Sequence, residues 1–136
     1  MILVDDHLLA KQLSGELPVA TGPNDLATTC TWWWRLASAV TGSRQGSLSR
    51  RLGADFAVDT VAVEVLFTLP DRVAMIDRRD LVPNMARVAA RYRLSLLAAE
   101  ALVAAEALGA DIVVGQDTPR LREAARVRGI TYLVEA

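Results

Sequence analysis

The chain has 136 residues, of which 52% are hydrophobic and 5% aromatic, and its formal net charge is −1. This length suits a single domain with a real core, and this composition excludes extensive disorder. The near-neutral charge excludes a general nucleic-acid coat protein, although it leaves room for a local basic groove.

The cysteine content and the first residues indicate the cellular compartment in which the protein is expected. Cys30 is the only cysteine, so no intrachain disulfide can form and a reducing compartment is expected. The opening sequence MILVDDH carries acids where a signal peptide would need a basic region. No apolar run reaches about 18 residues, so we expect no transmembrane helix and a cytoplasmic location.

The first third of the chain predicts one strand and two helices. An apolar run over residues 1–4 predicts a short buried strand, and residues 8–14 predict a helix that Gly15 stops. A loop rich in turn-forming residues follows. Residues 31–41 predict a second helix, because apolar residues recur at i, i+3, i+4 and i+7 from Trp33; Gly42 would end it.

The middle of the chain is ambiguous. Residues 43–53 predict a polar, basic loop or short helix. Residues 61–67 alternate β-branched or aromatic side chains with others, which favours a strand. A helix also remains possible there, because Val58, Val61 and Val65 are spaced for one helical face.

The second half predicts the order helix, helix, strand, helix, strand. Asp80 is the predicted N-cap of a helix that ends near Arg91. Its predicted buried stripe consists of Leu81, Val82, Met85, Val88, Ala89 and Tyr92. A second helix is predicted from Ser95 to a stop at Gly109.

The last three elements follow from short local signals. Residues 112–114 predict a buried parallel strand. Thr118 and Pro119 open a helix, with Gly129 just past its end, and residues 130–134 predict the last strand. Together with the strand at residues 1–4, this order predicts one α/β domain over residues 1–136, a three-layer α/β/α sandwich with a mostly parallel sheet.

Acidic residues follow two of the predicted strands. Asp5 and Asp6 come after the first strand and Asp117 after the strand at 112–114, at the sheet edge where α/β proteins bind ligands. Gathered carboxylates repel each other unless a cation such as Mg²⁺ or Mn²⁺ joins them. The alternative is capping, since Asp117 directly precedes the Thr118–Pro119 helix start, and both interpretations stay open.

Glu100 favours the functional interpretation. Its neighbours three and four positions away on the predicted helix are apolar, and burying a carboxylate there is costly without a partner or a metal. The alternative is a surface-lying helix with Glu100 at its edge.

Two segments carry a family resemblance. The stretch YRLSLLAAEALVAAEALGADIVVGQD (residues 92–117) resembles the C-terminal core of PIN domains, and ILVDD (residues 2–6) resembles their first strand with its metal-binding Asp. The resemblance implies a PIN-like fold. It also implies, for the toxin class of the family, a Mg²⁺-dependent ribonuclease, a hydrolase that is often dimeric and is held by an antitoxin.

The site residues match the family only in part. Asp5 matches the first-strand acid, and Asp117 matches the acid of a Thr-x-Asp turn in which Gly115 replaces the Thr. The family's late-helix Asp falls on Ala98, and Glu100 lies two residues on, about 200° around the helix.

The family's remaining acid, a Glu on an earlier helix, has no clear match; Glu64 is a weak candidate because it falls on a predicted strand. Two hypotheses follow. The first is a ribonuclease that uses Asp5, Glu100 and Asp117, with Asp6 as a further metal ligand. The second is a catalytically inactive PIN-like module that binds a protein or RNA partner.

A second resemblance is weaker. ILVDDH also resembles the start of response-regulator receiver domains, which need a phospho-acceptor Asp after the third strand and a Lys near the C-terminus. The only Lys is Lys11, and the segment FTLP (residues 67–70) has no Asp, so we do not adopt this interpretation.

The remaining candidates lie on predicted helices. Trp32, Trp33 and Trp34 span about 200° of helix surface, so all three cannot face one core. We assign Trp33 to the core and Trp32 and Trp34 to partner or nucleic-acid binding, with Arg35 as a phosphate contact. His7 is either a ligand or base, or a polar residue that opens a helix.

Arginines are numerous in the second half of the chain. They either line a nucleic-acid groove or form solvated helix faces. They are Arg87, Arg91, Arg93, Arg120, Arg122, Arg126 and Arg128.

Overall fold

The computed structural model describes residues 1–13, 25–41 and 68–135. Within them the elements follow in the order β1 (Ile2–Val4), α1 (Asp6–Leu13), β2 (Leu26–Ala27), α2 (Cys30–Thr41), β3 (Val73–Ala74), α5 (Arg78–Tyr92), α6 (Leu96–Leu108), β4 (Asp111–Val114), α7 (Pro119–Val127) and β5 (Tyr132–Val134). The predicted alternation of helices and strands in the second half is confirmed.

The strands form one sheet in the order β3-β2-β1-β4-β5, and every neighbouring pair is parallel. The chain leaves β1 toward β2 and β3 on one side, and later returns to the other side of β1 with β4 and β5. The boundary between β1 and β4 is therefore the point where the strand order reverses, and such a point opens a crevice at the carboxyl ends of the strands.

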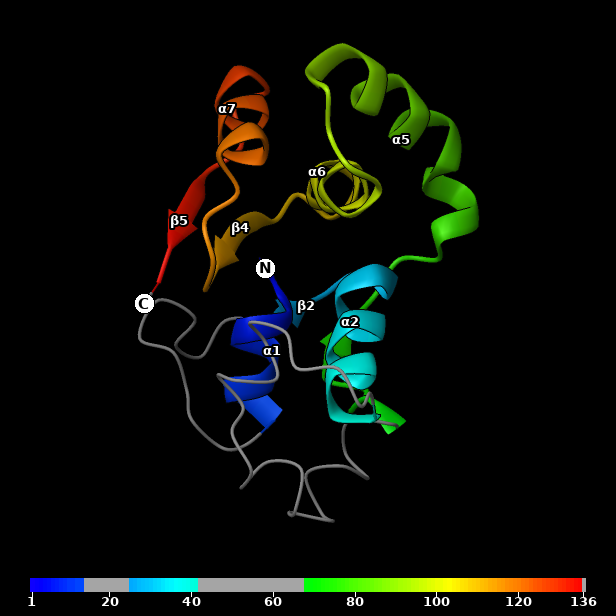
Figure 1. The fold of residues 1–136 in the computed structure, drawn as a ribbon, viewed down its shortest axis with the longest axis vertical. Coiled ribbons are helices and arrows are strands. Elements are labelled where there is room, and N and C mark those ends of the chain that lie inside the picture. Colours follow the sequence, from blue (N-terminus) through cyan, green and yellow to red (C-terminus); the bar gives the residue numbers. More distant parts are fainter. Residues whose placement is uncertain (14–24, 42–67, 136) are drawn as a thin grey trace.

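Two helical layers cover the sheet. Because side chains alternate along a strand, Leu3 of β1 and its partner Ile112 of β4 face the layer of α5, α6 and α7. Val4 and its partner Val113 face the layer of α1 and α2. Figure 1 shows the two helical groups on opposite sides of the strands. The fold is thus the three-layer α/β/α sandwich that the sequence predicts.

Helix α6 is the centre of the larger core. All eight residues from Ala98 to Ala105 are buried, and α6 contacts α5, α7, α2, β1 and β4. A helix that is apolar on every side belongs in the interior. The alternative in which this helix lies on the surface with Glu100 at its edge is therefore wrong, since Glu100 is 1% exposed.

The predicted ends of α6 and α7 are confirmed. The Ser95 hydroxyl accepts a hydrogen bond from the Ala98 amide (3.2 Å), and Gly109 ends α6 in the left-handed conformation with φ of 62°. Pro119 is the first residue of α7, and Gly129, with φ of 71°, follows its end.

The start of α5 differs from the prediction. The N-cap is Asp77, whose extended backbone lets its carboxylate accept from the Arg79 amide at 2.9 Å, and Asp80 already lies in the first turn. Pro83 consequently lies inside the helix. Val82 was predicted to be buried, but it is 50% exposed, because the core takes only the face of Leu81, Met85 and Val88.

Several other predictions concern short or undescribed segments. Helix α1 begins at Asp6, two positions before the predicted start, and the two-residue strands β2 and β3 were not predicted. Gly15, Gly42, Glu64 and the expected elements at residues 43–53 and 61–67 lie outside the described residues. In the described part of the chain, no helix has the length and apolar character to cross a membrane.

Candidate functional site

A small polar cavity of about 90 Å³ lies where the carboxyl ends of β1 and β4 meet. It occupies the place where the reversal of strand order predicts a ligand crevice. The sequence-predicted residues Asp5, Asp6, His7, Trp32 and Arg35 are brought together there, with Leu97, Gln116 and Thr118 completing the lining. Glu100 and Asp117 do not line this cavity.

Asp5 connects the two strand ends. One carboxylate oxygen accepts from the Leu8 amide at 3.0 Å, which caps α1. The other accepts from the backbone amides of Gly115 (2.9 Å) and Gln116 (3.2 Å), just after β4. Asp5 is 3% exposed, so these three donors satisfy a buried carboxylate that would otherwise be costly.

Gly115 is required by its neighbour in α1. A Cβ at this position would lie 2.8 Å from the Cβ of His7, closer than such atoms approach. The close contact of the Gly115 turn with α1 therefore favours a residue without a side chain at this position.

Asp6 is a buried acid that pairs with an arginine of α2. It is 1% exposed, and its Oδ2 atom lies 3.2 Å from the Nε atom of Arg35 on α2. Burial raises the pKa of Asp6 above its ordinary value, Arg35 opposes this rise, and the neighbouring Asp5 adds to it. The predicted phosphate contact, Arg35, is thus already paired with a carboxylate.

His7 is buried beside Asp6. Its Nε2 atom lies 2.8 Å from the Oε1 atom of Gln116, while its Nδ1 atom and the Oδ2 atom of Asp6 have no hydrogen-bond partner in the described part of the protein. His7 lies in the first turn of α1, as the interpretation of a polar residue that opens a helix expects, but it is buried, with 4% of its surface exposed. The cavity therefore presents polar atoms that water or a ligand can satisfy.

Glu100 is held in a separate cluster. Its carboxylate accepts from the Thr31 amide (3.0 Å) and hydroxyl (3.2 Å) and from the Nε atom of Arg78, and Arg78 also donates to the Thr31 hydroxyl. Thr31 lies in the first turn of α2, where a negative charge is favourable, and Arg78 is the first residue of α5. Glu100 therefore joins α6 to the starts of α2 and α5.

Asp117 is bound at the start of α7. Its carboxylate accepts from Arg122 (2.8 Å) and from the Tyr132 hydroxyl (3.2 Å), which in turn accepts from the Thr118 amide at 2.9 Å. Burial, together with the charge of Asp117, raises the pKa of Tyr132 to about 12. Thr118 makes no side-chain cap bond, so Asp117 and Tyr132 organise this turn.

The acids do not form one cluster. Among residues 1–13, 25–41 and 68–135, no group of three or more His, Cys, Asp or Glu side chains is arranged to hold a metal ion. Asp5, Glu100 and Asp117 each have a different set of donors. Ala98, where the family resemblance places an acid, is 1% exposed.

The three tryptophans differ sharply in exposure. Trp32 is 3% exposed, Trp33 is half-buried, and Trp34 is 66% exposed. The assignment of Trp33 to the core is thus only partly right, because Trp32 is more deeply buried. Of the two tryptophans predicted to contact a partner, only Trp34 presents a large free surface.

Trp34 borders a shallow cavity of about 440 Å³. The cavity is lined by Cys30, Thr31, Trp34, Arg78 and Leu96, and we call it the Trp34 surface. Leu96 is 60% exposed, and Met75, whose sulfur lies 3.6 Å from that of Cys30, is 37% exposed. The Glu100 cluster lies directly behind this surface, since Thr31 and Arg78 belong to both.

The arginines of α7 and of the turn that follows it form ion pairs or hydrogen bonds within the protein. Arg122, Arg126 and Arg128 pair with Asp117, Glu123 and Glu106, and Arg120 donates to the Arg93 carbonyl. These contacts favour the interpretation that the arginines form solvated helix faces. They do not favour a nucleic-acid groove, in which the arginines would be free to contact phosphates.

No family model matches the chain, and no curated protein sequence matches it.

Several partner residues in these clusters were not predicted from the sequence. Thr31 and Arg78 lie 69 and 22 positions from Glu100, and Gln116 lies 109 positions from His7. No local pattern marks such partners. A buried acid does predict that a partner exists, and that signal was available for Glu100.

Proposed function

We propose that this chain is a PIN-like domain that acts by binding another protein, and that its buried acids hold the fold together. The resemblance of residues 2–6 and 92–117 to PIN domains supports the first part, and the parallel α/β/α architecture is compatible with it. The observation that carries the second part is the engagement of Glu100 by Thr31 and Arg78.

The Glu100 cluster argues for a structural role in the following way. A carboxylate that serves a metal ion keeps oxygen lone pairs directed at the ion. Both oxygens of Glu100 instead accept from protein donors, and one donor is a guanidinium that neutralises its charge. To recruit Glu100 to a metal, the protein would have to leave Arg78 without its partner and release the start of α2.

The Trp34 surface supports a protein partner. Trp34 and Leu96 are both more than half exposed beside Arg78, and tryptophan and arginine dominate the binding energy of many interfaces. Among the described residues beside this surface, Arg35 and Arg78 are each paired with a buried carboxylate, so these two arginines offer little free positive charge to RNA phosphates. The family resemblance implies an antitoxin-like protein as the partner class.

The test uses the full chain as bait, with wild type compared with Trp34→Ser and Leu96→Ser. Val127→Ser is the matched control, because Val127 is a similarly exposed aliphatic residue on α7. The captured protein is then purified and titrated against each variant. We expect Trp34→Ser to weaken binding at least about tenfold, which is the scale of a hot-spot loss, and Val127→Ser to leave it unchanged.

Two results would contradict the protein-binding proposal. One is a purified partner whose affinity does not depend on Trp34 or Leu96. The other is sedimentation showing a homodimer that Trp34→Ser dissociates, because the Trp34 surface would then be occupied by a second copy of this chain.

A second candidate function is a Mg²⁺- or Mn²⁺-dependent ribonuclease, possible only if the acids rearrange on binding. The cavity at the β1–β4 boundary favours it, because Asp6 and His7 leave polar atoms without hydrogen bonds there. Asp5 and Asp6 offer the hard oxygen ligands that these ions prefer, with Asp117 and Glu100 as further acids. A bound ion would activate water for phosphodiester hydrolysis.

A cleavage assay separates the two candidates. Fluorescent single-stranded RNA is incubated with the wild type or Asp5→Asn in Mg²⁺ or Mn²⁺. Cleavage by the wild type that Asp5→Asn abolishes would favour the ribonuclease. The same background level of RNA cleavage with both proteins would favour the binding module.

A further inference from the structure

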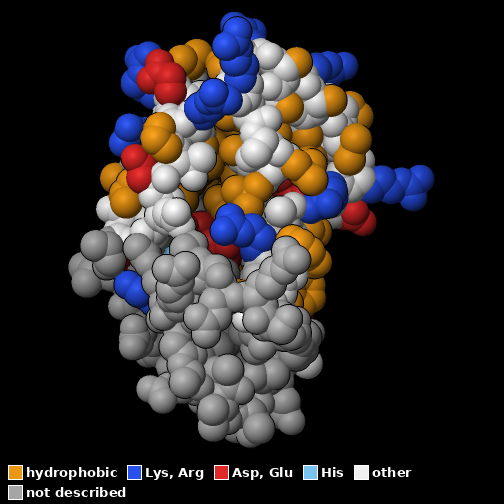
Figure 2. All heavy atoms as spheres, viewed as in Figure 1, with side chains coloured by type: hydrophobic (Ala, Val, Ile, Leu, Met, Phe, Trp, Pro, Cys, Tyr) orange, Lys and Arg blue, Asp and Glu red, His pale blue; other side chains and the backbone are white. Residues whose placement is uncertain are grey.

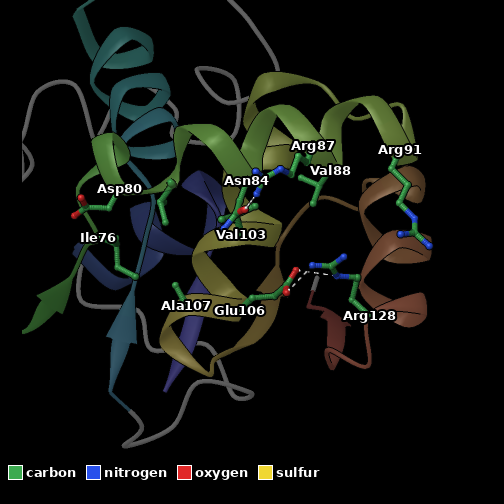
Figure 3. A pocket seen from close by; sticks show the side chains of 11 residues that line it. Ile76, Asp80, Asn84, Arg87, Val88, Arg91, Val103, Glu106, Ala107 and Arg128 are labelled. Carbon is green, nitrogen blue, oxygen red and sulfur yellow. Dashed lines mark hydrogen bonds and ion pairs between the residues drawn. The ribbon is translucent and has the colours of Figure 1, made fainter.

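A further cavity lies on the layer of helices that covers the opposite face of the sheet from α1 and α2. It is about 530 Å³, within the range of small-molecule sites, and lies between α5, α6 and the end of α7 (Figure 3). Its apolar lining includes Leu81, Val88 and Val103, each at most 5% exposed. The cavity shares no lining residue with the Trp34 surface.

Three arginines line this cavity, and only one is neutralised. Arg128 pairs with Glu106 through two hydrogen bonds of 3.1 and 2.8 Å. Arg87 donates to the neutral Asn84 side chain at 2.9 Å, and Arg91 lies 5.5 Å from the centre of the Tyr92 ring. In the described part of the chain neither Arg87 nor Arg91 forms an ion pair, in contrast to Arg35 and Arg78.

The charges are unevenly distributed along the cavity. Asp80 lies beside Ile76 at one end, whereas Arg91 lies at the other end, as Figure 3 shows. Arg87 and Arg91 are four positions apart on α5, so their side chains lie on the same side of the helix. The Arg87 guanidinium is turned toward Asn84, on the side of Asp80, and Arg91 lies at the other end, so the two arginines border the apolar wall at different points along α5. Figure 2 shows the same mixture of basic and exposed hydrophobic side chains over this part of the molecule.

We propose that this cavity binds an organic phosphate monoester, with its phosphoryl group at Arg87 and Arg91 and its apolar or aromatic body against Leu81, Val88 and Val103. A phosphate monoester carries about −1.5 to −2 charges at neutral pH, which matches two unpaired guanidinium groups. Guanidinium groups also bind phosphate oxygens in a two-point geometry. The apolar wall gives the body of the ligand a surface that inorganic phosphate cannot use.

The test is calorimetric titration of the full chain with 1-naphthyl phosphate, compared with 1-naphthol, inorganic phosphate and adenosine monophosphate. The variants are Arg87→Gln with Arg91→Gln, and Ala107→Trp, which fills the cavity from its rim. Arg126→Gln is the matched control, because Arg126 is an exposed arginine that does not line the cavity. Thermal melts confirm that each variant is folded.

We expect 1-naphthyl phosphate to bind more tightly than 1-naphthol or inorganic phosphate. The double arginine variant should lose at least about tenfold in affinity, Ala107→Trp should also weaken binding, and Arg126→Gln should have no effect. Tighter binding of adenosine monophosphate than of the naphthyl ester would point to a nucleotide as the natural ligand. The proposal is overturned if 1-naphthyl phosphate does not bind at millimolar concentration, if inorganic phosphate binds equally well, or if the double variant binds like Arg126→Gln.

Discussion

The Oδ2 atom of Asp5 accepts a hydrogen bond of 2.9 Å from the amide of Gly115, 110 positions later in the chain. This bond fixes the end of β1 to the turn after β4, where the strand order of the sheet reverses. The same carboxylate also accepts from Gln116 and caps α1 through Leu8.

Replacing Asp5 by Ala should therefore lower the free energy of unfolding by about 2–4 kcal/mol, because a helix cap is lost and buried amides are left without an acceptor. Urea unfolding measures this change. Asp111→Asn is the control, since Asp111 is exposed on β4, and it should cost less than about 0.5 kcal/mol. A loss for Asp5→Ala no larger than that of the control would show that Asp5 does not tie the strands together.

Gly115→Ala should destabilise the fold by about 1–3 kcal/mol through overpacking. The added Cβ would lie 2.8 Å from the Cβ of His7, which the helix α1 holds in place. Unfolding of Gly115→Ala, His7→Gly and the double variant measures the coupling between the positions. The clash explanation predicts that Gly115→Ala costs less in the His7→Gly background, and strict additivity would refute it.

Removing only the cation of the Glu100–Arg78 pair should cost more stability than removing both charges. Arg78→Met leaves the carboxylate of Glu100 without its cation, and we expect a loss of about 1–3 kcal/mol, reduced from the fully buried case because the Arg78 side chain is 37% exposed. Adding Glu100→Gln to Arg78→Met should recover part of the loss, since glutamine keeps an acceptor for Thr31 without the charge. If the double variant is less stable than Arg78→Met, the unpaired charge of Glu100 is not the cause of the stability loss in Arg78→Met.

Asp6 predicts a pH dependence. Burial raises its pKa in the folded protein above the ordinary value of 3.8. The protonated form therefore stabilises the fold fully below that ordinary value, and this contribution is lost as the pH rises through the raised folded-state pKa.

Asn cannot ionise, so Asp6→Asn should become more stable relative to wild type as the pH rises through this interval. The measurement is the difference in unfolding free energy between the two proteins as a function of pH. A difference that stays constant or falls would contradict the raised pKa.

The elements that the sequence predicted correctly are those with local signals. Ser95 and Gly109 mark the ends of α6, and Pro119 marks the start of α7. The strands β2 and β3 have only two residues each, which is too short for a periodic pattern. They form through tertiary pairing, because β2 pairs with β1 and β3 pairs with β2. The N-cap of α5 was misplaced because Asp77 and Asp80 both fit a capping pattern, and only the backbone conformation decides between them.

The candidate site was predictable only in its location. The acids after β1 and β4 do lie at the carboxyl edge of the sheet, as the order of elements implies. Their partners come from distant segments: Asp6 pairs with Arg35, Glu100 with Arg78 and Asp117 with Tyr132. These pairings depend on tertiary packing, so the sequence could indicate that each buried acid needs a partner but not which residue supplies it.

Metal binding most directly tests the central claim, which is that the acids of this chain are structural. Mn²⁺ and Mg²⁺ are titrated calorimetrically into the wild type and into Asp5→Asn combined with Asp117→Asn. We predict no saturable binding at millimolar metal in either protein, because the carboxylates are already bound by Gly115, Arg78 and Arg122. Stoichiometric binding by the wild type that disappears in the double variant would contradict the account and favour the ribonuclease.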